Sequence, residues 1–165
     1  MHVDKHCVKM ILEYAQLLST AHRVLDGVPD ISLTATGRKK KVFRLDSDLD
    51  SILYSATHVN HPSAIWVRKS EQNYMWLCEL LEELCVEYTY RYGKTHKVEA
   101  IGLMQTLKNN FPKNIPVGPF TEPTPAMPDE YKVPGNSLQS YFNYYNGAKT
   151  RMFSWKNRPT PAFVC

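Results

Sequence analysis

The stretch that decides the fold runs from Asp4 to Asp26 and has the sequence DKHCVKMILEYAQLLSTAHRVLD. Its apolar side chains recur at steps of three and four residues, which is the spacing of one face of an α-helix. These apolar positions are Val3, Cys7, Met10, Ile11, Tyr14, Leu17, Leu18, Ala21 and Leu25. Asp4 suits a helix N-terminus, and Gly27 with Pro29 stops a helix. We therefore predict an amphipathic helix over residues 4–26.

A second apolar pattern extends from Pro62 to Tyr92 and predicts the longest helix of the chain. Pro62 suits a first helical turn, and Gly93 is a natural stop. The outer face of this helix carries the acidic residues Glu79, Glu82, Glu83 and Glu87. We expect these carboxylates to be solvated and to repel a phosphate backbone. Shorter helices are expected over residues 48–57, 95–109 and 137–155, the last one interrupted near Gly147.

Two segments between the helices are expected to be irregular. Residues 28–45 contain Pro29, Gly37 and the run Arg38-Lys39-Lys40-Lys41, and we expect a loop with a basic knob, or alternatively a short hairpin. Seven prolines between Pro112 and Pro134 exclude regular helix and sheet interior. Apolar residues among the prolines favour an extended strap over a loose linker. The prediction is one all-α domain, residues 1–165, with a strap at 112–134 and a C-terminal helix and tail at 137–165.

Composition limits the cellular setting. The chain has 165 residues and a formal net charge of +4, and it contains no uninterrupted apolar run of about 20 residues, the length that a membrane span needs. Its first residues, MHVDKHCVKM, carry charges where a signal peptide has an apolar stretch. The four cysteines form no CxxC pair, so we expect buried free thiols. We therefore predict a cytoplasmic protein that contacts no membrane.

The positive charge is concentrated in the C-terminal segment. After Glu130 the chain has five basic residues, no acidic residues and eight aromatic residues. Aromatic rings stack on unpaired bases, and cations neutralise phosphates, so this composition predicts an anionic partner. The alternative is that the aromatic residues form helix core and the cations only its exposed edge. The candidate DNA-binding residues here are Tyr144, Tyr145, Lys149, Arg151, Trp155, Lys156 and Arg158.

The first predicted helix also has a polar stripe, at offsets of three and four residues. It consists of His2, His6, Lys9, Glu13, Gln16 and Thr20. A solvated helix face is the simplest interpretation, but histidines are unusual choices for such a face. His6 and Glu13 would lie about 10 Å apart along the axis, from a rise of about 1.5 Å per residue. Such a pair can bracket a substrate.

The pair His58-x-x-His61 is a further candidate. Two imidazoles at this spacing can bind a metal when an acid or a cysteine completes the site. Because a loop just before a helix often carries polar caps, we expect capping or phosphate contact and no metal.

These residues resemble a known family. Asp4-x-His6 followed by Glu13 resembles the first helix of the phage pyrimidine-dimer DNA glycosylases, also called endonuclease V. Tyr144-Tyr145-Asn146-Gly147-Ala148-Lys149 is similar to the Tyr-Tyr-Gly-Lys ending with which that family contacts DNA. Arg91-Tyr92-Gly93 is loosely similar to the end of its central helix. The resemblance covers about a third of the chain and extends to uncharacterised phage proteins that carry the same label.

The resemblance implies a glycosylase with associated lyase activity on damaged pyrimidines in double-stranded DNA. An amine attacks the sugar C1′, the base leaves, and the resulting Schiff base permits strand cleavage by β-elimination. Glu13 would stabilise positive charge on the sugar or move protons, and His6 would orient the sugar-phosphate. No cofactor is implied. Lys9, the run from Arg38 to Lys41, the two loop histidines and the C-terminal cations would contact a DNA whose nucleotide is flipped out.

The nucleophile departs from the family pattern. In the family it is the α-amino group of the mature N-terminus, whose pKa of about 7.7–8.0 leaves it largely reactive. Here an additional N-terminal segment, Met1 or Lys9 could supply the amine, and we expect the additional segment. Leu12 and Gln16 also stand where the family has arginines.

The leading hypothesis is thus a DNA-repair enzyme of phage type that acts as a monomer in the infected host cell. Two alternatives remain open: a noncatalytic DNA-binding protein that uses the same surface, and a metal-dependent nuclease built on His58 and His61.

Overall fold

The computed structural model describes residues 2–164 and shows mostly helices with one pair of strands. In chain order the elements are α1 (Asp4–Asp26), β1 (Val28–Leu33), β2 (Lys39–Arg44), α2 (Leu49–Ile52), α3 (Pro62–Val67), α4 (Glu71–Tyr92), α5 (Lys97–Ala100), α6 (Leu103–Asn109), the 3-10 turn η1 (Asp129–Tyr131), α7 (Ser137–Ala148) and the 3-10 turn η2 (Thr150–Met152). The two strands form an antiparallel sheet, so the prediction of an all-α domain is wrong.

Helix α1 has the predicted bounds, and the prediction of an amphipathic helix is confirmed. Val3 precedes it in an extended conformation, and the Gly27 N–H donates to the Arg23 carbonyl at 3.1 Å where the helix ends. Its apolar stripe lies in the core, with Cys7, Ile11, Ala15, Leu18 and Ala21 all buried. Burying each large aliphatic side chain stabilises the fold by about 1.5–3 kcal/mol.

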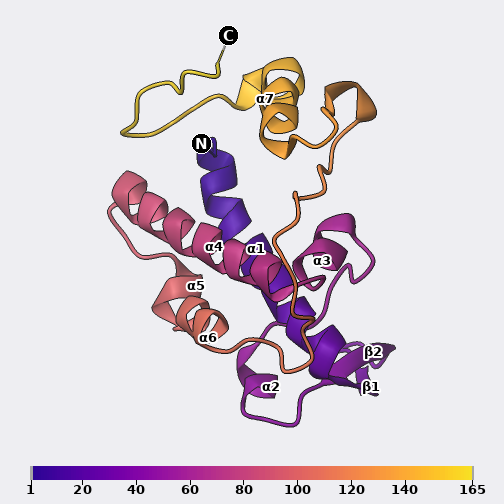
Figure 1. The fold of residues 1–165 in the computed structure, drawn as a ribbon. Coiled ribbons are helices and arrows are strands. Elements are labelled where there is room, and N and C mark those ends of the chain that lie inside the picture. Colours follow the sequence, from indigo (N-terminus) through magenta and orange to yellow (C-terminus); the bar gives the residue numbers. More distant parts are fainter. Residues whose placement is uncertain (1, 165) are drawn as a thin grey trace.

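Helix α4 packs across α1, and α3 and α6 complete the core around this pair (Figure 1). Three of the four cysteines, Cys7, Cys78 and Cys85, are buried free thiols, as predicted. Cys165 lies outside the described residues. The other core side chains of α4 and α6 are Tyr74, Leu77, Leu81, Leu84, Tyr88, Leu103 and Leu107.

The single helix predicted from Pro62 to Tyr92 is divided into α3 and α4, so that prediction is wrong. The break falls at Arg68–Ser70, where Ser70 adopts an extended conformation and its hydroxyl accepts a hydrogen bond from the Asn73 N–H at 3.2 Å. The Asn73 side chain in turn donates to the Trp66 carbonyl at 2.9 Å. An internal cap thus ends one helix and begins the next, although the apolar pattern continues across the break.

The other predicted helices are shorter in the structure than expected. The 48–57 segment forms helix only from Leu49 to Ile52. The 95–109 segment is divided into α5 and α6 at Gly102, whose φ of +75° favours glycine. The last helix ends at Ala148 and is followed by η2, well before the predicted end at Trp155.

Residues 28–45, for which we predicted a loop with a basic knob or alternatively a short hairpin, contain the β1–β2 hairpin, so the alternative is confirmed. Its register pairs Val28 with Arg44 and Leu33 with Lys39. The turn includes Gly37 at a φ of +75°, a conformation that few other residues adopt. Both faces of the ribbon are largely exposed, so the chain shows no hydrophobic alternation that would have distinguished a strand from a loop. The hairpin lies at the end of α1 opposite to α7 (Figure 1).

The proline-rich segment 112–134 runs along the body without regular structure apart from η1. Its backbone is held by side chains of the core helices. The Trp66 indole N–H donates to the Thr121 carbonyl at 2.9 Å, and the Asn73 Oδ1 accepts from the Thr121 N–H at 2.8 Å. Near the start of the segment, the Asp26 carboxylate accepts two further N–H groups. These contacts provide the backbone partners that the prolines cannot provide for one another.

Candidate functional site

The polar stripe of α1 meets the aromatic helix α7 through one side-chain contact. The His6 Nδ1 and the Tyr145 Oη are joined by a hydrogen bond of 2.5 Å, and the two rings are nearly perpendicular with centroids 5.6 Å apart. The two residues are 139 positions apart in the chain. The structure therefore brings together the two segments that the sequence singled out independently.

The surroundings of this contact keep both groups neutral near pH 7. Burial lowers the pKa of His6, the cations of Lys149 and Lys9 lower it further, and the Glu13 carboxylate only partly opposes them. Burial also raises the pKa of Tyr145 to about 12. A neutral imidazole can accept a proton, so His6 has the protonation state that a general base requires.

Glu13 lies on the solvent side of α1 and forms an ion pair with Lys9. The Lys9 Nζ is 2.8 Å from the Glu13 Oε1, one helical turn away. The exposed fraction of the side chain is 66% for Lys9 and 38% for Glu13, so both groups are accessible. The structure therefore places an amine and a carboxylate side by side, and both belong to the same stripe as His6.

The stripe does not remain on the surface along the whole helix. Thr20 is buried, and its Oγ1 accepts the Thr57 N–H at 3.2 Å. At the other end, the His2 Nε2 and the Tyr14 Oη form a hydrogen bond of 2.8 Å. The accessible part of the stripe is thus centred on His6, Lys9 and Glu13.

Two cations, Lys149 and Arg151, follow α7 in the chain, and the charge of Lys149 acts on His6. The Lys149 Nζ is 4.9 Å from the centre of the Tyr144 ring, a cation–π contact that leaves its charge near the surface. Tyr144 also packs on Tyr131, with centroids 5.3 Å apart. Arg151 is exposed. Lys149 and Arg151 therefore remain suited to a phosphate backbone.

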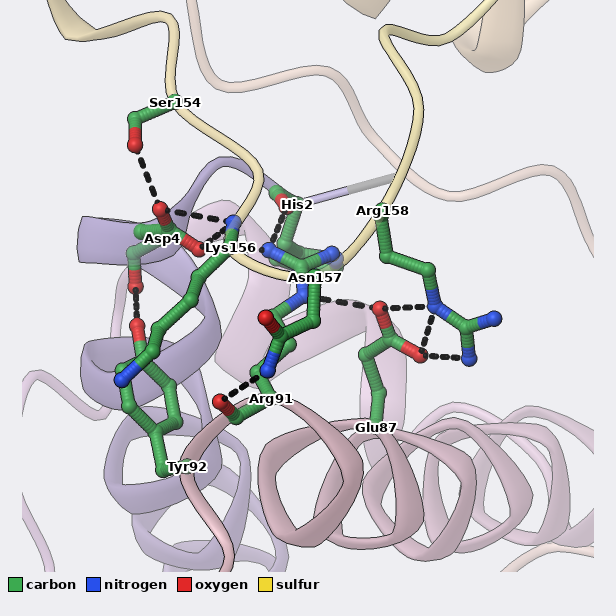
Figure 2. A network of polar contacts seen from close by, with 9 residues as sticks. All are labelled: His2, Asp4, Glu87, Arg91, Tyr92, Ser154, Lys156, Asn157 and Arg158. Atoms are coloured by element: carbon green, nitrogen blue, oxygen red, sulfur yellow. Dashed lines mark hydrogen bonds and ion pairs between the residues drawn. The ribbon is translucent and has the colours of Figure 1, made fainter.

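The tail cations face the protein. Figure 2 shows a network in which the buried Arg91, with a 2% exposed side chain, donates to the Asp4 Oδ1 at 3.1 Å and to the Glu87 Oε1 at 2.7 Å. Arg158 donates to the second Glu87 oxygen at 2.7 Å. Its guanidinium also lies 3.8 Å from the centre of the Tyr90 ring. Arg158 therefore has intramolecular partners for its charge.

Asp4 fixes the tail to the start of α1. Its carboxylate accepts the Lys156 backbone N–H at 2.9 Å and the Ser154 hydroxyl at 2.5 Å. The Lys156 ammonium lies over the Tyr92 ring at 5.4 Å. Burial raises the pKa of Asp4, but the hydrogen bonds from Ser154, Lys156 and Arg91 outweigh burial and hold that pKa below its ordinary value. Asp4 is therefore charged at neutral pH and binds the tail.

Glu87 was expected to belong to a solvated acidic face, and that prediction is wrong. Its side chain is only 22% exposed and accepts hydrogen bonds from two arginines. The hydrogen bond from Arg158, and that from Arg91, hold the pKa of Glu87 below its ordinary value against the opposing effect of burial. The spacing of Glu87 and Arg91, four residues apart in a helix, was a signal of pairing that the sequence already contained.

Two hollows are evident on the molecule, and neither is lined by His6 or Glu13. One of about 410 Å³ lies beneath the tail and is lined by His2, Leu80, Glu83, Leu84, Glu87, Arg91, Trp155, Arg158, Pro159 and Pro161. The other, of about 360 Å³, lies beside the hairpin. The candidate site at His6 and Glu13 thus lies outside both of these hollows.

The basic run of the hairpin is far from this surface. Arg38, Lys39, Lys40 and Lys41 are all exposed, and none of them has an ion-pair partner within residues 2–164. The hairpin follows the C-terminal end of α1, about 30 Å from His6 at 1.5 Å per residue. The predicted DNA-binding residues therefore do not gather in one site.

The loop histidines act locally. His61 precedes α3, and its Nδ1 accepts the Ser63 N–H at 3.2 Å, which confirms the expectation of polar capping. The His58 Nδ1 and the Thr57 Oγ1 form a hydrogen bond of 2.8 Å. Across the described residues, no group of three or more His, Cys, Asp or Glu side chains could hold a metal ion. The metal-dependent alternative thus has no ligand set in this part of the chain.

Within residues 2–164, no helix has both the length and the apolar character needed to cross a membrane. Comparison with protein-family models, with curated proteins and with solved structures found no match for the chain.

Proposed function

We propose that the protein is a DNA-repair glycosylase with associated lyase activity on damaged pyrimidines in double-stranded DNA. The observation that carries this proposal is the hydrogen bond between His6 and Tyr145. It sets His6 of α1 beside Tyr145 of α7, and Lys149 follows at the end of that helix. A DNA strand that follows Lys149 and Arg151 would then present its sugars near His6 and Glu13.

The chemistry assigned to this surface needs an amine, a carboxylate and a proton acceptor. The amine attacks the sugar C1′, the bond from C1′ to the base breaks, and loss of the ring oxygen bond yields a Schiff base. Removal of a C2′ proton then breaks the bond to the 3′ phosphate. Glu13 would stabilise the positive charge that develops on the sugar, and His6 would accept a proton. Among the described amines, Lys9 is the one ion-paired with Glu13, which supports Lys9 as a candidate nucleophile.

Borohydride trapping on duplex DNA that contains pyrimidine dimers tests the lyase proposal. Reduction of a Schiff base leaves the protein covalently attached to the DNA, which a denaturing gel detects. We expect trapping with the unmodified protein and with Lys5→Gln, a matched control that removes an exposed lysine of the same helix. Loss of trapping in Lys9→Gln alone would identify Lys9 as the nucleophile. Trapping that persists in Lys9→Gln would exclude Lys9 as the nucleophile, and no trapping with an unmodified protein that includes the additional N-terminal segment would refute the lyase activity.

Glu13→Gln tests the role of the carboxylate. Because the amide keeps the shape but cannot hold a negative charge, turnover should fall by about 10²- to 10⁴-fold while DNA affinity changes little. Glu83→Gln is the matched control, since Glu83 is exposed on α4. Equal turnover in the two variants would exclude Glu13 from the reaction.

A noncatalytic DNA-binding protein is the second candidate. It is favoured by the observation that His6 and Glu13 line neither of the two hollows described above, so neither hollow could hold a flipped nucleotide at these residues. This candidate predicts that Glu13→Gln leaves DNA binding intact and that no damaged substrate yields a product with any form of the protein.

A further inference from the structure

We propose that the hollow beside the hairpin is a binding site for the phosphate group of a nucleotide. It has a volume of about 360 Å³ and lies between the ribbon, the end of α1 and the segment that follows α2. Its lining consists of Arg23, Ser32, Leu33, Thr34, Lys40, Val42, Phe43, Arg44, Asp50, Leu53, Ser55 and Ala56. This site is separate from the surface at His6 and Glu13, and it does not depend on the function proposed for that surface.

The pairing of the strands places two cations on one face of the ribbon. Ser32 is the cross-strand partner of Lys40, and side chains alternate between the faces along a strand. Lys40 and Arg44 therefore share one face and both line the hollow, while Lys39 and Lys41 belong to the opposite face and do not line it. Only one lysine of the basic run can thus serve this site.

Arg23 lines the base of the hollow, and its guanidinium N–H groups are already used in hydrogen bonds within the protein, so none is left to bind a ligand. Its buried guanidinium donates to the carbonyls of Tyr54, Phe43 and Leu53 at 2.7–2.8 Å. It also donates to the Asp50 carboxylate at 2.6 Å. Arg23 thereby ties β2 to α2 and the segment that follows, and it holds the walls of the hollow in place before any ligand binds.

The charge that remains in the hollow is positive. The Asp50 carboxylate balances Arg23, and it also accepts from the Leu45 N–H at 2.9 Å and from Arg44 at 3.2 Å. These contacts hold the pKa of Asp50 at about 2, so it stays ionised. Arg44 is shared between carboxylates and is 54% exposed, whereas Lys40 has no ion-pair partner among residues 2–164. An anion would supply the missing partner.

The rest of the lining fits a nucleotide better than a bare anion. Ser32 and Ser55 supply hydroxyl donors near the cations, while Val42, Leu53 and Ala56 supply an apolar wall. Ligand pockets typically have volumes from about 300 Å³ upward and combine an apolar surface with a few polar groups. The phosphate could belong to a free nucleotide or to a nucleic-acid strand, since both present the same group.

Calorimetric titration of the full chain with inorganic phosphate, with a nucleoside 5′-monophosphate and with a short DNA duplex tests the site. Lys40→Gln is the site variant, and Lys41→Gln is its matched control, because it removes the same charge from the adjacent position on the opposite face. Loss of one charge-assisted contact should weaken phosphate and nucleotide binding about tenfold in Lys40→Gln, with less than about a twofold change in Lys41→Gln. Equal losses in the two variants would overturn the proposal, because nonspecific attraction would explain them.

A second variant tests the location without changing charge. Ser55→Leu fills the hollow, so it should abolish nucleotide binding while leaving the thermal unfolding midpoint close to that of the unmodified protein. Unchanged nucleotide affinity in Ser55→Leu would overturn the proposal. Binding of the monophosphate identifies a nucleotide site. If only the duplex binds, and this binding is lost in Lys40→Gln but retained in Lys41→Gln, the ligand is a phosphate of a nucleic-acid strand. Borohydride trapping at the other surface is unaffected by either result, so the two proposals fail separately.

Discussion

The hairpin and the C-terminal tail both carry clustered cations, but the tail uses its cations to bind the rest of the protein. Arg158 is held by Glu87 and Tyr90, and Lys156 lies over Tyr92. On the hairpin, the residues from Arg38 to Lys41 are exposed, and no ion pair engages them within the described part of the chain. Both regions are rich in cations, but the cations from Arg38 to Lys41 of the hairpin lack ion-pair partners among the described residues, whereas Arg158 of the tail is paired.

This difference has a physical consequence for any polyanion that binds. A cation already paired with a carboxylate releases little free energy on meeting a phosphate, because it must first give up that partner. An unpaired exposed cation displaces condensed counterions from the DNA, and the full salt-dependent free energy of their release then favours binding. The hairpin is therefore expected to contribute more to DNA affinity than the tail, although the tail is richer in aromatic residues.

The largest effect is expected from breaking the network that holds the tail. In Arg91→Met, two carboxylates lose their shared buried cation, and removing one partner of a buried ion pair costs about 3–5 kcal/mol. The free energy of unfolding, measured by urea denaturation, should fall by an amount in this range. Arg151→Met is the control, since Arg151 is exposed in the same region. A variant at Arg91 as stable as the unmodified protein would mean that the network does not hold the tail.

The next largest effect is expected on the salt dependence of DNA affinity when the cations of each region are replaced. Replacing Lys39, Lys40 and Lys41 together by Gln should lower the slope of log affinity against log salt by about 2 to 3, from about 0.9 per phosphate contact. Replacing Lys156 and Arg158 by Gln should change that slope by less than about 1. Duplex binding measured at several salt concentrations checks both values. The reverse order would show that the tail leaves the protein to bind DNA.

The smallest expected effect is a loss of folding stability on acidification, caused by histidines at the two ends of α1. In the folded protein, burial holds the pKa of His2 at about 3 and that of His22 at about 4. In the unfolded chain both have a pKa of about 6.5, so from pH 6.5 down to about 4 unfolding takes up protons and stability falls with the pH. We expect a loss of about 2 kcal/mol per pH unit between pH 6 and pH 5, about 1 kcal/mol from each histidine. His2→Gln and His22→Gln should each flatten this dependence in urea denaturation, and a flat profile for the unmodified protein would contradict it.

Much of the helical core could be predicted because its signals are local. The apolar spacing in α1 and the stop at Gly27 lie within the segment that they define, and the structure has the predicted bounds. The break between α3 and α4 could not be predicted from apolar spacing, because the cap at Ser70 depends on Asn73 and on the packing of Trp66. The hairpin could be predicted only as an alternative to a loop, because its exposed faces carry no alternating pattern.

The candidate site could be predicted only in part. His6, Glu13 and Tyr145 were singled out from their own segments, but their common location was not in the sequence. Glu87 was expected to be solvated, although its spacing from Arg91 indicated a pair. Asp4 was recognised as a helix start and as part of the Asp4-x-His6 motif, but its contact with Lys156, which joins residues 152 positions apart, was not predicted.

By itself, the sequence determined which helices carry an apolar face and where cations are concentrated, since both properties depend on residues a few positions apart. Only the tertiary structure decided which of those cations keep a free charge. The Arg158 pair with Glu87 spans 71 positions, and the His6 contact with Tyr145 spans 139. Such pairings depend on the path by which the strap returns the chain to the start of α1, and that path is set by packing and hydrogen bonds along its whole length.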